Sequence, residues 1–338
     1  MRETRYAWLV VTLLCAMLSS PVHADGSGAL SGRVVNGTAG GDAVGDLEVV
    51  LRSFEDQEER EQRTAVTDAD GGFRFEALET GENWVYLVRV LYGGVSYSGG
   101  MLSFAEGQAE LSVEVPVYET TTEDSPIVVE RAHIFLTVLE DRLSMTELYV
   151  FRNSADRTYI GTDEVDGRRY TAKFLLPEGS YDLILDDGSL GGRFAAIDGG
   201  FVDTEPQWPG TTQVLFSYAV DCARGWCDLT REVAHATANL NLLIEDVGAT
   251  VESQDLISQG VRETEGQTYV NYVGRGLAAG EELDLRVRLP GGVQPVRSAQ
   301  PMRTQSLPRI LLGTVLVALP LIYPFWRQRV QATASKER

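Results

Sequence analysis

The sequence predicts an all-β protein with two β-sandwich regions, which lie between an N-terminal leader and one C-terminal membrane helix. Apolar and polar residues alternate in many short segments, among them 111–117, 181–185 and 283–289, as half-buried antiparallel strands require. Glycine-rich turns recur between these segments, as at 70–72 and 290–292. Only the two ends of the chain carry long uninterrupted apolar runs.

Residues 1–24 have the three parts of a secretory signal peptide. Arg2 and Arg5 precede an apolar run from Ala7 to Leu18, and the small residue Ala24 ends the segment. We expect cleavage after Ala24. Cys15 follows a bulky leucine, does not resemble a lipobox cysteine, and is expected to leave with the leader.

The C-terminal apolar segment, 309–326, is predicted to be a single transmembrane helix. Its core from Ile310 to Trp326 is near the shortest length that crosses a hydrocarbon layer. Basic residues follow it in the tail 327–338, so the positive-inside rule places the C-terminus in the cytoplasm. The ectodomain is then periplasmic, on the outer side of a bacterial cell (inner) membrane, above a short stalk at 291–308. A buried core helix is the alternative for this segment.

A polar linker at 119–126 divides the β region into a first domain, 28–118, and a larger β-rich region, 127–290. Both regions are long enough to bury a core of their own. Between the two ends, helix is expected at most in two places. The charged segment 55–63 fits either a helix or a long hairpin loop, and 255–259 fits a turn or two of helix.

The first domain contains the run Thr67-Asp68-Ala-Asp70-Gly71-Gly72-Phe73-Arg-Phe75-Glu-Ala-Leu78-Glu-Thr-Gly81. This run resembles the hallmark of the carboxypeptidase regulatory-like family, to which the collagen-adhesin B-type modules are related. The resemblance implies a seven-stranded transthyretin-like sandwich and a noncatalytic module. It leads us to expect Asp68 and the glycines in a hairpin turn, with Phe73 and Phe75 in the core. Val66 stands where a calcium loop needs an acidic ligand, so a turn is favoured over a metal site.

The second region is similar to uncharacterised bacterial envelope β-sandwich proteins. The similarity rests on the segments 148–159, 174–179, 206–210 and 214–218. Asn153 and Asp156 are expected to serve a turn between two strands of this region.

The region between Asp25 and Ser306 is strongly acidic. It contains 47 acidic and 22 basic residues, which leaves about 25 negative charges. Such a field disfavours nucleic acid and anionic lipid and favours cations or basic partners. Spread over a large surface, the same charge also confers solubility.

After cleavage only Cys222 and Cys227 remain, and in an oxidising compartment they are predicted to form a disulfide that closes a tight loop. The loop would hold Arg224 and Trp226 at a rigid tip, which makes these two residues a candidate interaction site. Packing of Trp226 onto the disulfide is the alternative. No haem-attachment or zinc pattern accompanies the cysteines.

The sequence offers no catalytic, cofactor-binding or metal-ligating constellation, so we expect no enzyme and no cofactor. The two histidines of the mature chain, His133 and His235, lie in none of the known catalytic motifs. We therefore expect a membrane-anchored, noncatalytic interaction or scaffold module of the cell envelope, whose partner is another envelope protein. One alternative is a carbohydrate-binding envelope protein that stacks sugars on Trp84 and Trp208. Another is an accessory factor in envelope protein or cytochrome assembly.

Overall fold

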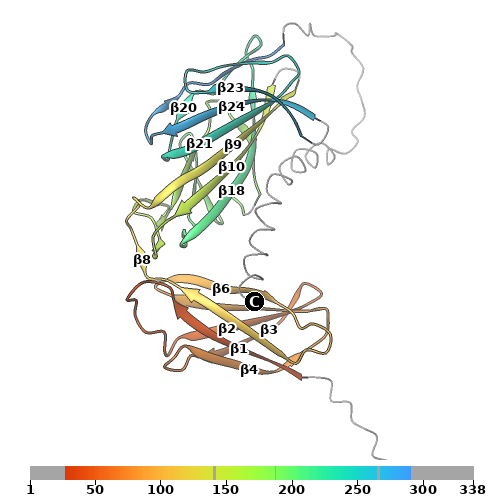
Figure 1. Ribbon diagram of the computed structural model, residues 1–338, viewed down its shortest axis with the longest axis vertical. Helices are drawn as coiled ribbons and strands as arrows, with labels where there is room; N and C mark the ends of the chain where they lie inside the picture. The colour runs from red at the N-terminus through yellow and green to blue at the C-terminus, as the bar shows by residue number, and fades with distance from the viewer. Residues whose placement is uncertain (1–26, 140–141, 187, 265–266, 291–338) are drawn as a thin grey trace, which may run out of the picture. The chain divides into compact units, whose positions relative to one another are not determined.

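The computed structural model describes residues 27–139, 142–186, 188–264 and 267–290, and every regular element in these ranges is a β-strand (Figure 1). The expected all-β fold is therefore confirmed for these residues. The signal peptide, the stalk, the membrane helix and the tail lie outside the described residues. The described residues contain no helix long and apolar enough to span a membrane.

The chain divides into two compact units. Unit 1 ends at Thr120 and also includes the separate segment Asp156–Thr158, while the remainder forms unit 2. The boundary lies within the polar segment 119–126. Two hydrogen bonds attach this segment to the rest of unit 1: the Thr38 hydroxyl donates to the Asp156 carbonyl at 2.9 Å, and the hydroxyls of Tyr97 and Thr158 share a hydrogen bond of 2.8 Å. Asp156 thus serves more than the expected turn.

Unit 1 is a sandwich of a three-stranded sheet, β4-β1-β7, and a four-stranded sheet, β3-β2-β5-β6. The pairing of β1 with β7 is parallel and the other pairings are antiparallel. The seven strands are β1 (Ser27–Asn36), β2 (Glu48–Glu55), β3 (Glu58–Val66), β4 (Gly72–Glu79), β5 (Trp84–Tyr92), β6 (Val95–Leu102) and β7 (Glu110–Val117).

The turn before β4 forms as the sequence leads one to expect. One carboxylate oxygen of Asp68 accepts the amides of Asp70 and Gly72 at 2.9 and 2.7 Å. Gly71 has φ +82°, and a β-carbon there would meet the carbonyl oxygen of Val34. Beyond the turn, Phe73 and Phe75 are buried on one face.

Neither of the two segments considered for helix is helical. In the first, Asp56 and Gln57 have φ of 50° and 71° and make a two-residue hairpin turn, after which β3 begins. The strand forms despite its polar composition because its backbone pairs with the half-buried β2. The second segment enters β23 (Ile257–Thr264).

Unit 2 is built on a seven-stranded sheet with the order β15-β18-β10-β9-β21-β24-β23 (Figure 1). Its strands are β9 (Ile127–Leu139), β10 (Arg142–Asn153), β15 (Tyr181–Leu185), β18 (Gly210–Asp221), β21 (Thr237–Glu245), β23 and β24 (Gln267–Leu277). β9 and β21 pair in parallel and the rest are antiparallel.

Short sheets complete the unit. One has the order β14-β17-β16, with β14 (Ala172–Leu175), β16 (Phe194–Ile197) and β17 (Gly200–Asp203). A second has the order β19-β26-β22, with β19 (Trp226–Asp228), β22 (Thr250–Glu252) and β26 (Arg286–Arg288). The remaining strands of the unit form two pairs, β20 (Arg231–Glu232) with β25 (Glu282–Leu283) and β12 (Glu164–Val165) with β13 (Arg168–Arg169). The two-residue strands β8 (Thr120–Thr121) and β11 (Thr158–Tyr159) also pair with each other.

One hydrophobic core joins the seven-stranded sheet to the short sheets of unit 2. Its centre is aromatic: the ring of Phe174 lies 4.9 Å from that of Phe201 and 5.3 Å from that of Phe216. In the segment 283–289, every second side chain is buried, as the alternation predicts. The core therefore fixes which side of each strand faces inward.

Candidate functional site

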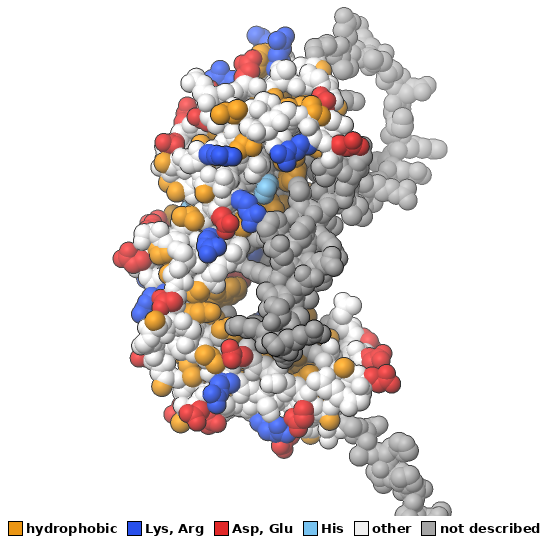
Figure 2. Space-filling model, viewed as in Figure 1, with side chains coloured by type: hydrophobic (Ala, Val, Ile, Leu, Met, Phe, Trp, Pro, Cys, Tyr) orange, Lys and Arg blue, Asp and Glu red, His pale blue; other side chains and the backbone are white. Residues whose placement is uncertain are grey.

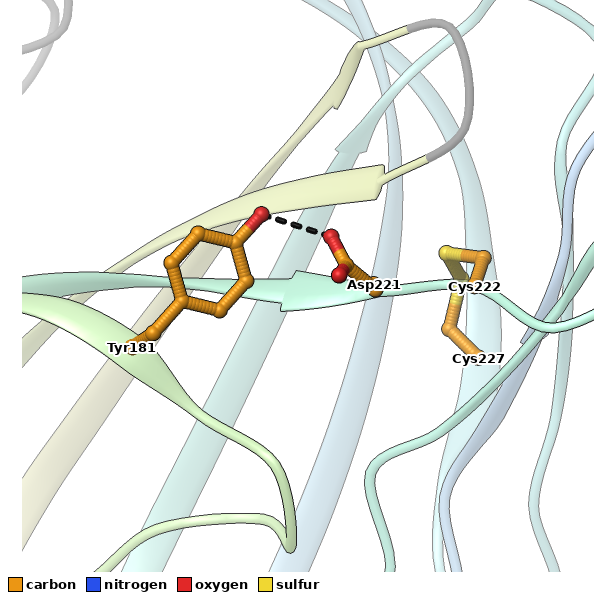
Figure 3. Close-up of a disulfide and its surroundings, with 4 residues drawn as sticks. All are labelled: Tyr181, Asp221, Cys222 and Cys227. Carbon is orange, nitrogen blue, oxygen red and sulfur yellow. Dashed lines mark hydrogen bonds between the residues drawn. A yellow bond between two sulfur atoms is a disulfide. The ribbon is translucent and has the colours of Figure 1, made fainter.

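The structure confirms the predicted disulfide between Cys222 and Cys227, whose Cα atoms are 4.3 Å apart (Figure 3). The bridge begins directly after β18 and closes onto β19, and Cys227 is buried in the core of unit 2. Beside it, the hydroxyl of Tyr181 donates to a carboxylate oxygen of Asp221 at 2.6 Å. The base of the loop is thus attached to two strands of the large sheet.

The tip of this loop presents Arg224 and Trp226 as exposed side chains. Arg224 has φ +56° and Gly225 φ +80°, which lets the chain turn back within the disulfide-closed loop. Trp226 is 38% exposed, and the guanidinium carbon of Arg288 lies 5.6 Å from the centre of its ring. Gly225 also accepts the amide of Leu289 at 2.9 Å, so the tip is fixed to the end of the described chain.

The two tryptophans considered for sugar stacking are both half-buried. The ring of Trp84 stacks on that of Tyr86, with centroids 6.4 Å apart. The indole nitrogen of Trp208 is buried without a hydrogen-bond partner among the described residues. The two belong to different units, Trp84 to unit 1 and Trp208 to unit 2, and sugar binding through either remains a prediction.

A buried polar cluster in unit 2 was not foreseen. Glu147 on β10 is fully buried and forms a two-bond ion pair with Arg231, with oxygen–nitrogen distances of 2.6 and 2.8 Å. Two tyrosines complete the cluster: Tyr218 donates to the first carboxylate oxygen at 2.5 Å, and Tyr149 to the second at 2.9 Å. Each carboxylate oxygen therefore accepts two hydrogen bonds.

Burial and the neighbouring groups shift the pKa values of the three donors of this cluster upward. Burial raises the pKa of the Tyr218 and Tyr149 hydroxyls, and the nearby carboxylate adds to the shift. Burial opposes the charge on Arg231, but Glu147, Tyr218 and Tyr149 together outweigh burial and raise the pKa of the guanidinium. Both acid oxygens already have their partners, so the arrangement suits structural support better than proton transfer. Glu147 itself was the sequence signal for this cluster: a carboxylate at a core-facing position of a strand requires a buried cation.

A small cavity of about 30 Å³ lies next to this cluster, between Arg231, Lys173 and His235. It has room for one or two water molecules. The Nε2 atom of His235 accepts the backbone amide of Lys173 at 2.8 Å, and burial lowers the pKa of the ring to about 4. The imidazole is therefore neutral at pH 7, and one nitrogen is already used as an acceptor.

A second two-bond ion pair joins Arg193 to the buried Asp203, with nitrogen–oxygen distances of 2.9 and 2.6 Å. In the ranges that the structure describes, no group of three or more His, Cys, Asp or Glu side chains is arranged to hold a metal ion. Acidic and basic side chains are scattered over the visible face of each unit, with apolar side chains exposed between them (Figure 2). The surface therefore combines a diffuse negative charge with separate apolar contacts.

Comparisons with known proteins do not assign the chain to a family. No protein family matches it, and no curated protein is similar to it in sequence. Among solved structures, it is similar to a DUF3823 family protein from Parabacteroides merdae, with 17% identity, a TM-score of 0.21 and coverage of 58% of this chain and 80% of that one.

Two pilins give similar values. For the major pilin SpaD from Corynebacterium diphtheriae the identity is 12%, the TM-score 0.22, and the coverage 76% of this chain and 81% of the pilin. For the major pilin subunit BcpA of Bacillus cereus the identity is 11%, the TM-score 0.20, and the coverage 76% and 86%. Likenesses this low carry no argument about function, and the site must be interpreted from its own residues.

Proposed function

We propose that this protein is a noncatalytic interaction module of the bacterial cell envelope. In this proposal the leader 1–24 exports the chain, and the apolar segment 309–326 holds it in the inner membrane with the C-terminus in the cytoplasm. Unit 1 then acts as a carboxypeptidase regulatory-like domain. Its seven strands in two sheets and the Asp68 turn before β4 support that assignment.

The observation that carries the proposal is the disulfide-closed tip. A large aromatic side chain on a clamped turn, next to an exposed arginine, is the kind of residue pair that dominates protein interfaces. Trp226 is presented with little conformational freedom left to lose, because the disulfide and the bond from Leu289 to Gly225 already fix its backbone. The tip therefore needs little loss of backbone freedom when it binds a partner.

The proposed partner is another envelope protein with a basic contact surface. About 25 negative charges on the region between Asp25 and Ser306 attract such a surface and repel nucleic acid. The noncatalytic assignment is supported by the cluster around Glu147, whose oxygens are used by Arg231 and two tyrosines. His235 is similarly engaged by a backbone amide.

The tip is tested by placing a photo-crosslinking amino acid at position 224 of the membrane-bound protein in cells. We expect one discrete adduct, which Trp226→Ala reduces. Leu190→Ala is the matched control, because Leu190 is an exposed apolar residue of the same unit. Equal adducts in Trp226→Ala and in the control variant would refute the proposed contact.

Two further outcomes separate the alternatives. Retention of the protein on peptidoglycan, lost in Trp84→Ala or Trp208→Ala, would replace the protein partner with a glycan.

The anchor is tested with a reporter fused after Arg338 that is active only in the cytoplasm. Activity of a periplasm-specific reporter at the same position would contradict the proposed orientation.

A further inference from the structure

The outer strands of the larger sheets differ in how well they are protected from pairing with another chain. Exposed edges are usually blocked by charge, by kinks or by short length. β3, at one edge of unit 1, has five charged residues among its nine. β15, at one edge of the unit 2 sheet, has five residues, and its register is interrupted between Tyr181 and Ile184. Both edges are therefore poor templates for a partner strand.

The opposite edge of the unit 2 sheet, β23, lacks most of this protection. It is eight residues long, and each side chain described on it, from 257 to 263, is exposed. Ile257 is 69% exposed and Val261 is 59% exposed, whereas only Arg262 and Glu263 carry charge. A single bulge lies between Ser258 and Gly260, and Gly260 has φ +83° with nothing near its missing side chain. The backbone edge is long and open.

The two aliphatic side chains lie on opposite faces of this edge. Val261 pairs with Val270, which packs against the core of unit 2. Val261 therefore lies on the core-facing side of the sheet, at its edge. Ile257 pairs with Val273, which alternation along β24 places on the face opposite to Val270 and Tyr272, so Ile257 lies on the side of the sheet away from this core. A strand added next to β23 would cover both side chains, one on each face.

We propose that β23 binds an extended, positively charged segment of a partner protein as an additional strand of the seven-stranded sheet. The open backbone edge selects an extended chain, and Ile257 and Val261 select β-branched or aliphatic residues opposite them. The acidic field of the ectodomain selects basic flanks. A second copy of this chain is disfavoured, because it would bring two strongly negative ectodomains together.

This inference rests on the proposed interaction function, but it concerns a different surface from the tip. The test uses the full-length protein in detergent micelles and a pool of synthetic peptides of about ten residues that alternate valine or threonine with lysine or serine. Binding is measured by fluorescence anisotropy, and the bound region by amide hydrogen exchange. The same peptides with alternate amides N-methylated keep the side chains and lose the donors that edge pairing needs.

The expected result is binding of the unmethylated pool with slower exchange of the amides in 257–264. Ile257→Thr/Val261→Thr keeps the β-branched shape but removes apolar contact, and we expect it to weaken binding at least about fivefold. Met101→Thr is the control, because Met101 is an exposed aliphatic residue on a strand of unit 1. Thermal unfolding of each variant verifies that it folds.

Absence of binding, or equal binding of the methylated peptides, overturns the proposal. Equal affinity of the double threonine variant overturns it as well. A dimer in sedimentation experiments that Ile257→Thr/Val261→Thr dissociates would make a second copy the occupant and also refute it. Trp226→Ala separates the two surfaces: peptide binding that survives this substitution supports the β23 site even if the tip contact fails.

Discussion

Replacing Arg231 with methionine tests whether the buried cluster supports unit 2. The substitution removes the only cation that pairs with the Glu147 carboxylate in the described part of the chain, and that carboxylate is fully buried. Breaking a buried ion pair on one side costs about 3–5 kcal/mol. With a typical urea dependence of about 2 kcal/mol per molar, the unfolding midpoint should fall by about 2 M.

The assay is urea unfolding of the full-length protein. Unfolding is monitored through hydrogen exchange of the β10 amides, so that unit 2 is observed by itself. Arg74→Met is the matched control, because Arg74 pairs with Glu110 at 2.9 Å on the exposed surface of unit 1 and should leave β10 unaffected. A change below about 0.5 M for Arg231→Met would refute the reasoning.

A second variant separates the charge from the space it fills. Glu147→Leu combined with Arg231→Met and with phenylalanine at both tyrosines removes every polar group of the cluster together. Because a buried pair replaced by apolar residues costs little, this variant should be more stable than Arg231→Met alone. The opposite order would show that packing, and not the unpaired carboxylate, causes the loss.

Three other changes have defined outcomes. Between pH 6.5 and 4, His235 binds a proton in the unfolded chain but not in the folded one. The free energy of unfolding therefore falls as the pH falls, by up to roughly 3 kcal/mol. In His235→Gln, the urea midpoint should depend less on pH over this range. Gly161→Ala should cost at least about 1 kcal/mol in the same assay, because φ is +79° and the added carbon meets the Tyr170 carbonyl. Cys222→Ser/Cys227→Ser should cost about 2 kcal/mol, and limited proteolysis should then cut within the loop.

Alternation and turn chemistry were sufficient to predict the β-class and several details of it. The buried side chains at 283–289 follow the period of two, and the turn at Asp68 follows from an aspartate and two glycines. The strand β3 was not predicted because it is an exposed edge with polar residues on both faces, so only its pairing with β2 determines its structure. No feature of the local sequence indicates that β3 will pair with β2.

The site divides in the same way. The disulfide was predictable because its cysteines are five residues apart and the sequence has only one other cysteine, Cys15 in the expected leader. Glu147 and Arg231 are 84 residues apart, and only the folded chain brings them together. Glu147 could have been recognised as a carboxylate at a core position, but no sequence pattern indicates which arginine reaches it. The open edge at β23 likewise depends on the order of strands in the sheet.

The position of β1 determines when unit 1 can complete its fold during synthesis. β1 is the first of the described strands to be made, yet it lies in the centre of its sheet, between β4 and β7. Its parallel pairing joins Leu30 to Leu111, so one side of β1 stays open until residues 110–117 have been made. Contacts this distant in sequence form slowly. A chain that stops before β7 therefore exposes one long unpaired edge of β1, which is a site for chaperone binding until the last strand has been made.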